Sequence, residues 1–369
     1  MTSLDSPAGR TQLLEQLVLL ESPTGDAASL ATLAARLEEE ALAAGLTVER
    51  ERHATGDHLI WRLPGSVSAD ERPLLFISHY DTVWPVGQLN TMPFAIDGDR
   101  VTGPGCFDTK GGIVALLAAL SSIGSSPHPP ITVLVVADEE IGSPTARTLV
   151  ETHAAAAQAI YGLEPPHPDG ALKTARLGSS RVRIAVAGVE AHAALDPDRG
   201  VSAIDELVDQ LLEVRSLLAG FPSVLVNVGT IEGGGRTNVI SGHAYADIGM
   251  RFVDIETERA VLDGIAALQP KRTGTSITVT VLSNRPAWAE TAAGRELLEH
   301  TSSVAASIGL TLDGRPAAGA ADTNVPGSLG YPTVDGLAPS GGGAHAVTEW
   351  MSLRSLEDRV RLIAALVTA

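Results

Sequence analysis

Apolar residues in the first 175 positions recur with two different spacings, which predict helices alternating with strands. Helical spacing covers residues 12–20 and 28–44, whereas short continuous apolar runs, typical of buried strands, cover residues 74–77 and 131–137. This alternation is typical of βαβ units. We therefore expect an α/β fold class for this part of the chain, with a mixed, largely parallel sheet and flanking helices.

The pattern changes beyond residue 178 to two helices among four strands. The predicted strands cover residues 181–187, 223–231, 244–252 and 276–282, and the predicted helices cover 202–218 and 256–268. This order is the split βαβ arrangement of ferredoxin-like α+β domains. Helical spacing returns at residues 294–307 and 353–367. We expect an inserted domain at residues 179–283, between a first part at residues 1–178 and a second part at residues 284–369.

Composition restricts the classes of protein to consider. A chain of 369 residues with 44% hydrophobic residues can form two domains with a real core. The net charge of -18 argues against nucleic-acid binding, which needs a basic face. No apolar run approaches the roughly 20 residues of a membrane span, and the first residues lack a signal-peptide pattern. We expect a soluble, cytoplasmic protein that contacts no membrane.

Cys106 is the single cysteine of the chain, which excludes an internal disulfide. As a nucleophile it would need an adjacent histidine and an oxyanion hole, so a small packed side chain is the favoured interpretation.

Polar clusters follow the predicted buried strands directly. His79 and Asp81 follow the first apolar run, and Glu139 and Glu140 follow the second. Open α/β sheets bind ligands at the carboxyl ends of their strands. These residues are therefore candidates for one common site.

His79 and Asp81 are two residues apart on extended chain, so their side chains point the same way. A histidine that binds metal usually donates its second ring N–H to a carboxylate, and Asp81 is suitably placed. Taken alone, the pair also fits a structural histidine.

Asp108 precedes an apolar helical segment at residues 113–120, where a carboxylate can act as an N-cap. The alternative is that its two oxygens bridge two cations. We favour the bridge because further carboxylates follow other predicted strands.

Glu139 and Glu140 are expected to leave the strand in opposite directions, so one would bind metal and the other would transfer protons. Adjacent buried carboxylates imply a cation or a raised pKa, although a solvated acidic turn is the simpler alternative.

Glu164 and His345 complete the candidate set. Glu164 follows an apolar strand-like segment, and His345 follows Gly341, Gly342 and Gly343, whose lack of side chains permits close approach of the backbone. Two histidines and three carboxylates without thiolate suit zinc, with cobalt or manganese as alternatives. Glu349, four residues after His345, could support these ligands.

Five blocks in this order resemble the M20 family of di-zinc metallopeptidases, most closely its glutamate carboxypeptidase branch. The blocks are HxDTV from His79, GxxDTKGG around Asp108, DEExGS around Glu139, LEP around Glu164 and GGGAH ending at His345. The resemblance spans almost the whole chain. It implies a zinc-peptidase-like catalytic domain interrupted by a dimerisation or lid domain, and a homodimer.

The resemblance also implies roles at matching positions. His79, Asp108 and Glu164 would hold one zinc ion, while Asp108, Glu140 and His345 would hold the other. Glu139 becomes the general base for a di-zinc-activated water. Asp81 would orient His79, and the peptide between Asp108 and Thr109 is expected to be cis.

Two segments of the inserted domain resemble further family segments. His192 would stabilise the oxyanion in the partner subunit's active site, with a surface histidine as the alternative. Asn238 and Arg251 would hold the terminal carboxylate of the substrate, although Arg251 could instead pair with Asp247. The chain departs from the family at residues 319–324, where a hydroxyl is missing, which leaves the polar contacts of the substrate open.

We therefore expect a metal-dependent hydrolase that cleaves a C-terminal amino acid, with glutamate as first candidate, from a peptidyl or N-acyl group. The alternative is an N-acyl-amino-acid deacylase of the acetylornithine deacetylase, succinyl-diaminopimelate desuccinylase or aminoacylase type. A non-catalytic dimeric binding protein is a remote third interpretation, disfavoured because Glu139 is intact.

Overall fold

The computed structural model describes residues 4–66 and 71–369. The prediction that the chain begins without a signal peptide concerns in part residues 1–3, which lie outside the described residues. The chain divides into two compact units. Unit 1 comprises Met1–Ala175 and Glu290–Ala369, and unit 2 comprises Arg176–Ala289.

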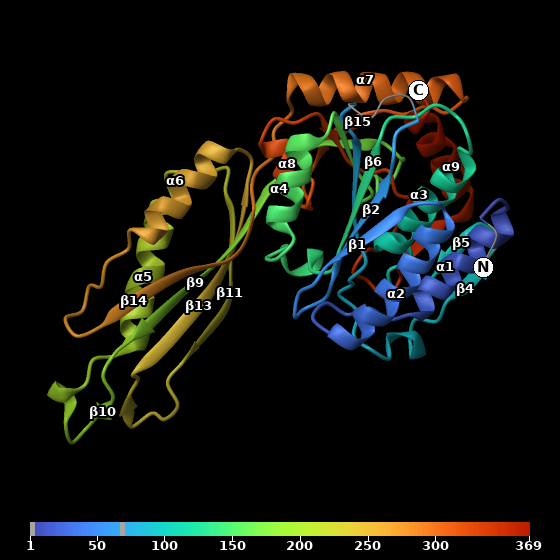
Figure 1. Cartoon of the computed structure of the whole chain (residues 1–369). Helices are drawn as coiled ribbons and strands as arrows, with labels where there is room; N and C mark the ends of the chain where they lie inside the picture. Colours follow the sequence, from blue (N-terminus) through green and yellow to red (C-terminus); the bar gives the residue numbers. More distant parts are fainter. Residues whose placement is uncertain (1–3, 67–70) are drawn as a thin grey trace. The chain divides into compact units, whose positions relative to one another are not determined.

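Unit 1 is built on a six-stranded sheet with the order β1-β2-β6-β3-β7-β16 (Figure 1). The strands are β1 (Thr47–Glu51), β2 (His58–Leu63), β3 (Leu74–His79), β6 (Ile131–Val136), β7 (Ala159–Gly162) and β16 (Thr333–Val334). Strands β6, β3, β7 and β16 are parallel, and β2 and β1 add an antiparallel edge. The predicted fold class, a mixed and largely parallel sheet with flanking helices, is confirmed.

Helices cover both faces of this sheet because successive strand residues point to opposite sides. On β3, Leu74 and Phe76 join one apolar core, while Leu75 and Ile77 join the other. Figure 1 shows α3 and α9 on one side of the sheet and α4 and α8 on the other. The first core takes side chains from α1 (Pro7–Leu19), α2 (Ala27–Ala43), α3 (Gly111–Ser122), α7 (Ala292–Ser307) and α9 (Leu353–Val367), and the second from α4 (Arg147–Ala156) and α8 (Asn324–Ser328).

Four of these helices begin at a side chain that caps the first turn. The capping residue accepts a hydrogen bond from the backbone N–H three positions later, which satisfies a donor without a helical partner and is worth about 1 kcal/mol. These N-caps are Ser6, Asp26, Thr291 and Ser352. The local sequence thus fixes where each helix starts.

Smaller elements complete unit 1. They are β4 (Ala95–Asp97), β5 (Arg100–Thr102), β17 (Gly341–Gly342) and β18 (Trp350–Ser352) in one sheet, β8 (Leu172–Arg176) paired with β15 (Gly314–Ala317), and the short helical turns η1 (Gln88–Asn90), η2 (Cys106–Lys110) and η3 (Glu139–Ile141). The glycine run before His345 therefore forms a short strand, β17, rather than only a loop. A Cβ at Gly341 would lie 2.1 Å from the carbonyl oxygen of Trp350, which confirms the predicted close backbone approach.

Unit 2 holds a four-stranded antiparallel sheet with the order β11-β13-β9-β14. Its elements are β9 (Gly178–Ala187), β10 (Ala191–His192), η4 (Pro197–Arg199), α5 (Ala203–Leu218), β11 (Leu225–Gly233), β12 (Val239–Ile240), β13 (His243–Phe252), α6 (Ile255–Ala266) and β14 (Ser276–Arg285). The β-α-β-β-α-β order is as predicted. Strands β9 and β14 run further than predicted because Ser179 pairs with Arg285, so unit 2 is longer at both ends than residues 179–283.

Among the described residues, no helix combines the length and the hydropathy that crossing a membrane requires.

Candidate metal centre

Parallel pairing places the ends of three strands of unit 1 at one edge of the sheet. His79, the last residue of β3, pairs with Val136 of β6, and Ile77 pairs with Gly162 of β7. The chain continues from β6 into the turn η3, and from β7 to Glu164 two residues later. The carboxyl edge of the sheet therefore carries acidic residues, as the sequence predicts.

The five predicted ligands form two groups that share Asp108. His79, Asp108 and Glu164 make one group, and Asp108, Glu140 and His345 make the other, with the ligand atoms in each within 4.8 Å of one another. In the first, His79 Nε2 lies 3.5 Å from Asp108 Oδ1 and 3.6 Å from Glu164 Oε1. In the second, His345 Nε2 lies 3.0 Å from Asp108 Oδ2 and 3.2 Å from Glu140 Oε2. The two oxygens of Asp108 thus face different groups.

The donor atoms fit divalent cations. His79 Nδ1 lies 3.0 Å from the backbone oxygen of Asp81. A proton on Nδ1 leaves Nε2 as a lone-pair donor. Both His79 Nε2 and Asp108 Oδ1 are buried without a hydrogen-bond partner. Tetrahedral ligands about 2.0–2.2 Å from zinc lie about 3.4 Å apart, close to the separations observed.

The charges of these residues also fit a cation site. Contacts with Asp108 and then Glu140 raise the pKa of His345 to about 11. Burial acts to raise the pKa of Asp108, but contacts with His345 and His79 hold it well below its ordinary value. Carboxylates crowded at this edge therefore require positive charge beside them, which protons on the histidines or divalent cations can supply.

Glu139 and Glu140 lie in the helical turn η3, so the extended backbone expected at these two residues is wrong. Both backbone N–H groups donate to the carboxylate of Asp81, at 3.2 Å each. The chain then reverses through Gly142 and Ser143, which have positive φ angles of 97° and 55°. Glu140 joins the second ligand group, whereas Glu139 is buried and belongs to neither.

The carboxylate of Asp81 does more than face His79. It lies 3.4 Å from His79 Nδ1, further than the carbonyl oxygen of the same residue, and it also accepts the hydroxyl of Thr24 at 2.8 Å. The carboxylate of Asp81 therefore holds the η3 turn, while its backbone carbonyl accepts the hydrogen bond of His79.

The sequence analysis did not identify Asp335, which contacts the backbone of the candidate ligand Glu164. Asp335 is fully buried and accepts hydrogen bonds from the Thr323 hydroxyl at 2.7 Å and from the backbone N–H of Glu164 at 3.3 Å. The available signal was an acid directly after the short strand β16, as at the other strand ends. The expected cis peptide between Asp108 and Thr109 is present. Cys106 is buried and its pKa is raised by burial, which fits a packed thiol rather than a nucleophile.

Unit 2 brings two predicted residues together. His192 on β10 pairs with Val239 on β12, and the N–H of Ala193 donates to the backbone oxygen of Asn238 at 3.0 Å. His192 Nδ1 accepts the backbone N–H groups of Ala194 and Leu195, at 3.2 and 3.1 Å. The neutral ring therefore carries its proton on Nε2, where it can be donated.

Arg251 is exposed on β13 and donates to the hydroxyl of Ser179 and to the carbonyl oxygen of Met250. The alternative pairing with Asp247 is wrong, because Arg183 binds both oxygens of that carboxylate at 2.7 Å.

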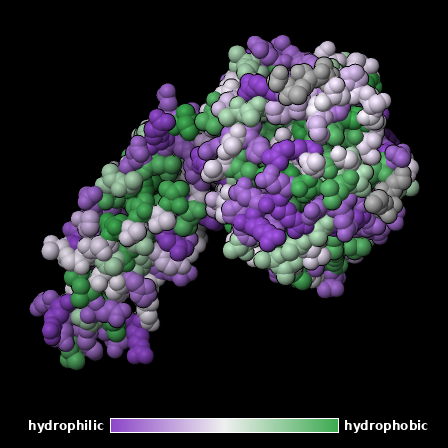
Figure 2. All heavy atoms as spheres, in the orientation of Figure 1, coloured by the Kyte–Doolittle hydropathy of each residue, from purple (hydrophilic) through white to green (hydrophobic). Residues whose placement is uncertain are grey.

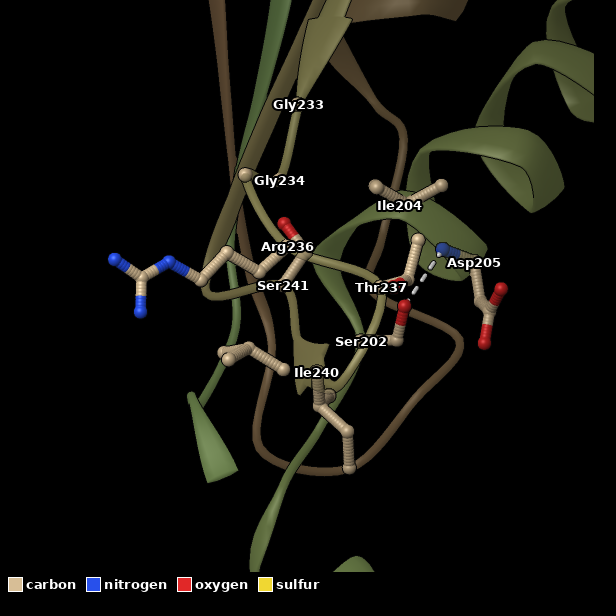
Figure 3. A pocket seen from close by; sticks show the side chains of 11 residues that line it. Ser202, Ile204, Asp205, Gly233, Gly234, Arg236, Thr237, Ile240 and Ser241 are labelled. Atoms are coloured by element: carbon tan, nitrogen blue, oxygen red, sulfur yellow. Dashed lines mark hydrogen bonds between the residues drawn. The ribbon is translucent and has the colours of Figure 1, made fainter. Parts of the chain in front are cut away.

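A pocket of about 700 Å³ in unit 2 lies where the loop from Gly233 to Ser241 passes the first turn of α5 (Figure 3). Arg236 and Thr237 line it next to Asn238 in the chain. In Figure 3 the Arg236 side chain extends away from Ser202 and Asp205. These two residues belong to the first turn of α5, where the Ser202 side chain accepts the backbone N–H of Asp205. The pocket contains none of the residues of the two metal-ligand groups.

Known proteins match this chain over most of its length. The model of "Peptidase family M20/M25/M40" matches residues 75–369. Carboxypeptidase G2 of Pseudomonas sp. is 29% identical over 365 residues, covering 96% of this chain and 87% of its own. A succinyl-diaminopimelate desuccinylase of Gluconacetobacter diazotrophicus is 33% identical, covering 56% of this chain and 59% of its own.

Solved structures share the fold. An M20 family metallo-carboxypeptidase of Sulfolobus solfataricus superposes with a TM-score of 0.75 at 15% identity, covering 97% of this chain and 98% of its own. The aminopeptidase PepT of Bacillus cereus gives a TM-score of 0.76 at 24% identity, covering 99% of each chain. The family match and the near full-length relative rule out the non-catalytic interpretation. The chain belongs to peptidase family M20/M25/M40 and is a metal-dependent peptidase or amidohydrolase.

Proposed function

We propose that the chain is a two-metal hydrolase that releases a C-terminal amino acid, with glutamate as first candidate, from a peptidyl or N-acyl group. The observation that carries the proposal is the position of Asp108, whose Oδ1 and Oδ2 face separate ligand groups. Because each group contains a histidine and a second carboxylate, the chain offers two cation sites joined by one bridging residue.

His79, Asp108 and Glu164 would hold one cation, and Asp108, Glu140 and His345 the other. Zinc is the first candidate, because these are nitrogen and oxygen donors at tetrahedral separations, with cobalt and manganese as alternatives. When bound, such cations polarise a carbonyl group and lower the pKa of water.

Glu139 is the proposed general base. It is buried at the same turn as Glu140 and belongs to neither ligand group, so we assign it proton transfer rather than metal binding. It removes a proton from the attacking water, whose oxygen bonds to the amide carbonyl carbon. The same proton then passes to the leaving nitrogen as the C–N bond breaks, giving a carboxylic acid and a free amine, which exchange a proton to become a carboxylate and an ammonium group.

His192, Asn238 and Arg251 are the proposed contacts from unit 2. The Nε2–H of His192 is a donor suited to an oxyanion, because Nδ1 is already occupied as an acceptor. Arg251 is an exposed residue, but partial burial of its guanidinium group and then the nearby Arg285 lower its pKa, and two guanidinium groups close together favour a carboxylate ligand.

A homodimer is the proposed assembly. The α5 helix exposes Ile204, Val208 and Leu212, which are four residues apart, at 40%, 51% and 55% of their surface. Apolar side chains are visible on the surface of this unit in Figure 2. Strand β11 is an unpaired edge of the sheet, which a second copy can extend. Light scattering should give a dimer that Val208→Glu dissociates and the control Leu42→Glu does not; a monomeric wild type would refute this assembly.

A deacylase is the second candidate, supported by the similarity to the desuccinylase. A substrate panel separates the two: N-acyl-glutamate, aroyl-glutamate, dipeptides, N-acetyl-ornithine and N-succinyl-diaminopimelate, each with added zinc. Preferential release of glutamate by the wild type, with no release by Glu139→Ala, would support the carboxypeptidase function. Turnover of only the ornithine or diaminopimelate substrates would assign the chain to the deacylases.

A further inference from the structure

The buried carboxylate of Glu349 accepts four hydrogen bonds, three of them from the backbone segment that carries Asp108. The residue is 1% exposed and precedes β18. Its Oε1 accepts the backbone N–H groups of Phe107 and Asp108 at 2.9 and 3.1 Å. Its Oε2 accepts the N–H of Gly105 at 3.1 Å and the indole N–H of Trp84 at 3.0 Å.

These hydrogen bonds act where helical bonding is interrupted. Asp108 has φ -115° and ψ 84°, which are not helical angles, although it lies inside the turn η2. The N–H groups of Phe107 and Asp108 therefore depend on the carboxylate for an acceptor. Hydrogen bonds to an ionised acceptor are about twice as strong as neutral ones, so Glu349 restricts the orientation of the Asp108 backbone.

The same arrangement recurs at the other acidic ligands. Asp81 accepts the N–H of Glu140 at 3.2 Å, and Asp335 accepts the N–H of Glu164 at 3.3 Å. Each acidic ligand thus has its own backbone N–H bonded to a buried carboxylate from another segment of the chain.

We propose that Glu349 is a positioning residue that fixes Asp108 for both cation sites, whereas Asp335 serves only the site that contains Glu164. The inference rests on the proposed metal centre. It predicts an asymmetry, because Asp108 belongs to both ligand groups and Glu164 to only one.

Glu349→Gln removes the charge and places an NH₂ group opposite two N–H donors. Calorimetric titration of the metal-free protein with Zn²⁺ should show both binding steps weakened, by about 10- to 100-fold, the range typical of residues that support metal ligands. Asp335→Asn should weaken one step and leave the other unchanged. The visible absorption of the Co²⁺-loaded protein should change at both sites in the first variant and at one in the second.

Glu206→Gln is the matched control. Glu206 is a buried glutamate of unit 2 that accepts the backbone N–H groups of Lys271 and Arg272, at 3.0 and 2.7 Å, and it touches neither ligand group. Loss of the Glu206 carboxylate should leave both Zn²⁺ binding steps unchanged. Glu349→Asp keeps the charge with a shorter reach, so partial recovery is expected, and it replaces the glutamine variant if that chain does not fold.

Three outcomes of these titrations would overturn parts of the proposal. Unchanged zinc affinity in a folded Glu349 variant, or weakening of a single step, would overturn the role of Glu349. Equal effects of the Glu349 and Asp335 variants would overturn the asymmetry. A wild-type chain that binds no zinc would refute the metal centre, and the inference with it.

Discussion

The carboxylate of Asp81 accepts the backbone N–H of Glu139 at 3.2 Å, so the residue expected to orient His79 also holds the proposed general base. Through this bond the end of β3 fixes the turn that follows β6. This bond therefore fixes the position of the proposed metal ligand His79 relative to the proposed general base Glu139. Both depend on the pairing of two parallel strands.

Replacing Glu139 with glutamine should separate metal binding from chemistry. We expect activity to fall about 100- to 10,000-fold, the usual contribution of a general base, while both cations still bind. The reason is that Glu139 belongs to neither ligand group. Steady-state kinetics and metal analysis of the same preparation check this, and loss of a cation along with activity would show that Glu139 is a ligand instead.

Replacing His192 with alanine should lower kcat about 100- to 1,000-fold, as the loss of one oxyanion donor does, with little change in thermal stability. His243→Ala is the control, because His243 is an exposed histidine of the same unit. Kinetics on the substrate that the panel identifies measures the effect. An unchanged kcat would make His192 a surface residue.

His58 should make stability depend on pH. Burial lowers the pKa of His58, and its neutral Nδ1 accepts the N–H of Ala137 at 3.2 Å. The unfolded chain therefore binds a proton below about pH 6.5, before the folded chain does. The free energy of unfolding should fall as pH decreases below that value, and urea titrations should show a smaller fall in His58→Gln. An identical pH dependence in the variant would contradict this.

Gly341→Ala should destabilise unit 1, since its Cβ would lie 2.1 Å from the Trp350 carbonyl oxygen and 2.7 Å from the Phe107 ring. We expect a loss of about 1–3 kcal/mol in the free energy of unfolding, the usual cost of overpacking. Gly235→Ala is the control, because no atom lies within 4 Å of its added Cβ. Equal unfolding midpoints for the two variants would mean that β17 adjusts without cost.

The sequence predicted the sheet and the candidate ligands that lie together at its edge, because both depend on local patterns. Continuous apolar runs gave β3 and β6, and the polar residues after each run identified the carboxyl edge of the sheet. The alternation of helices and strands also predicted the β-α-β-β-α-β order of unit 2. These features need only the periodicity of side chains along each element.

The sequence could not predict contacts between distant segments. Asp335 and Glu164 are far apart in the chain, and only the parallel pairing of β16 with β7 brings them together. The turn at Glu139 and Glu140 was mistaken for extended chain because its acceptor, the Asp81 carboxylate, lies on another strand. Hydrogen bonds of this kind have no local sequence signal.

The number of cations that each chain binds tests the two-metal centre most directly. Metal-free protein is dialysed against excess Zn²⁺, freed of unbound metal and measured by elemental analysis, for the wild type and for Asp108→Asn. Because Asp108 faces both ligand groups, we predict two zinc ions per wild-type chain and fewer than one in the variant. One ion or none in the wild type, or two in the variant, would contradict the account.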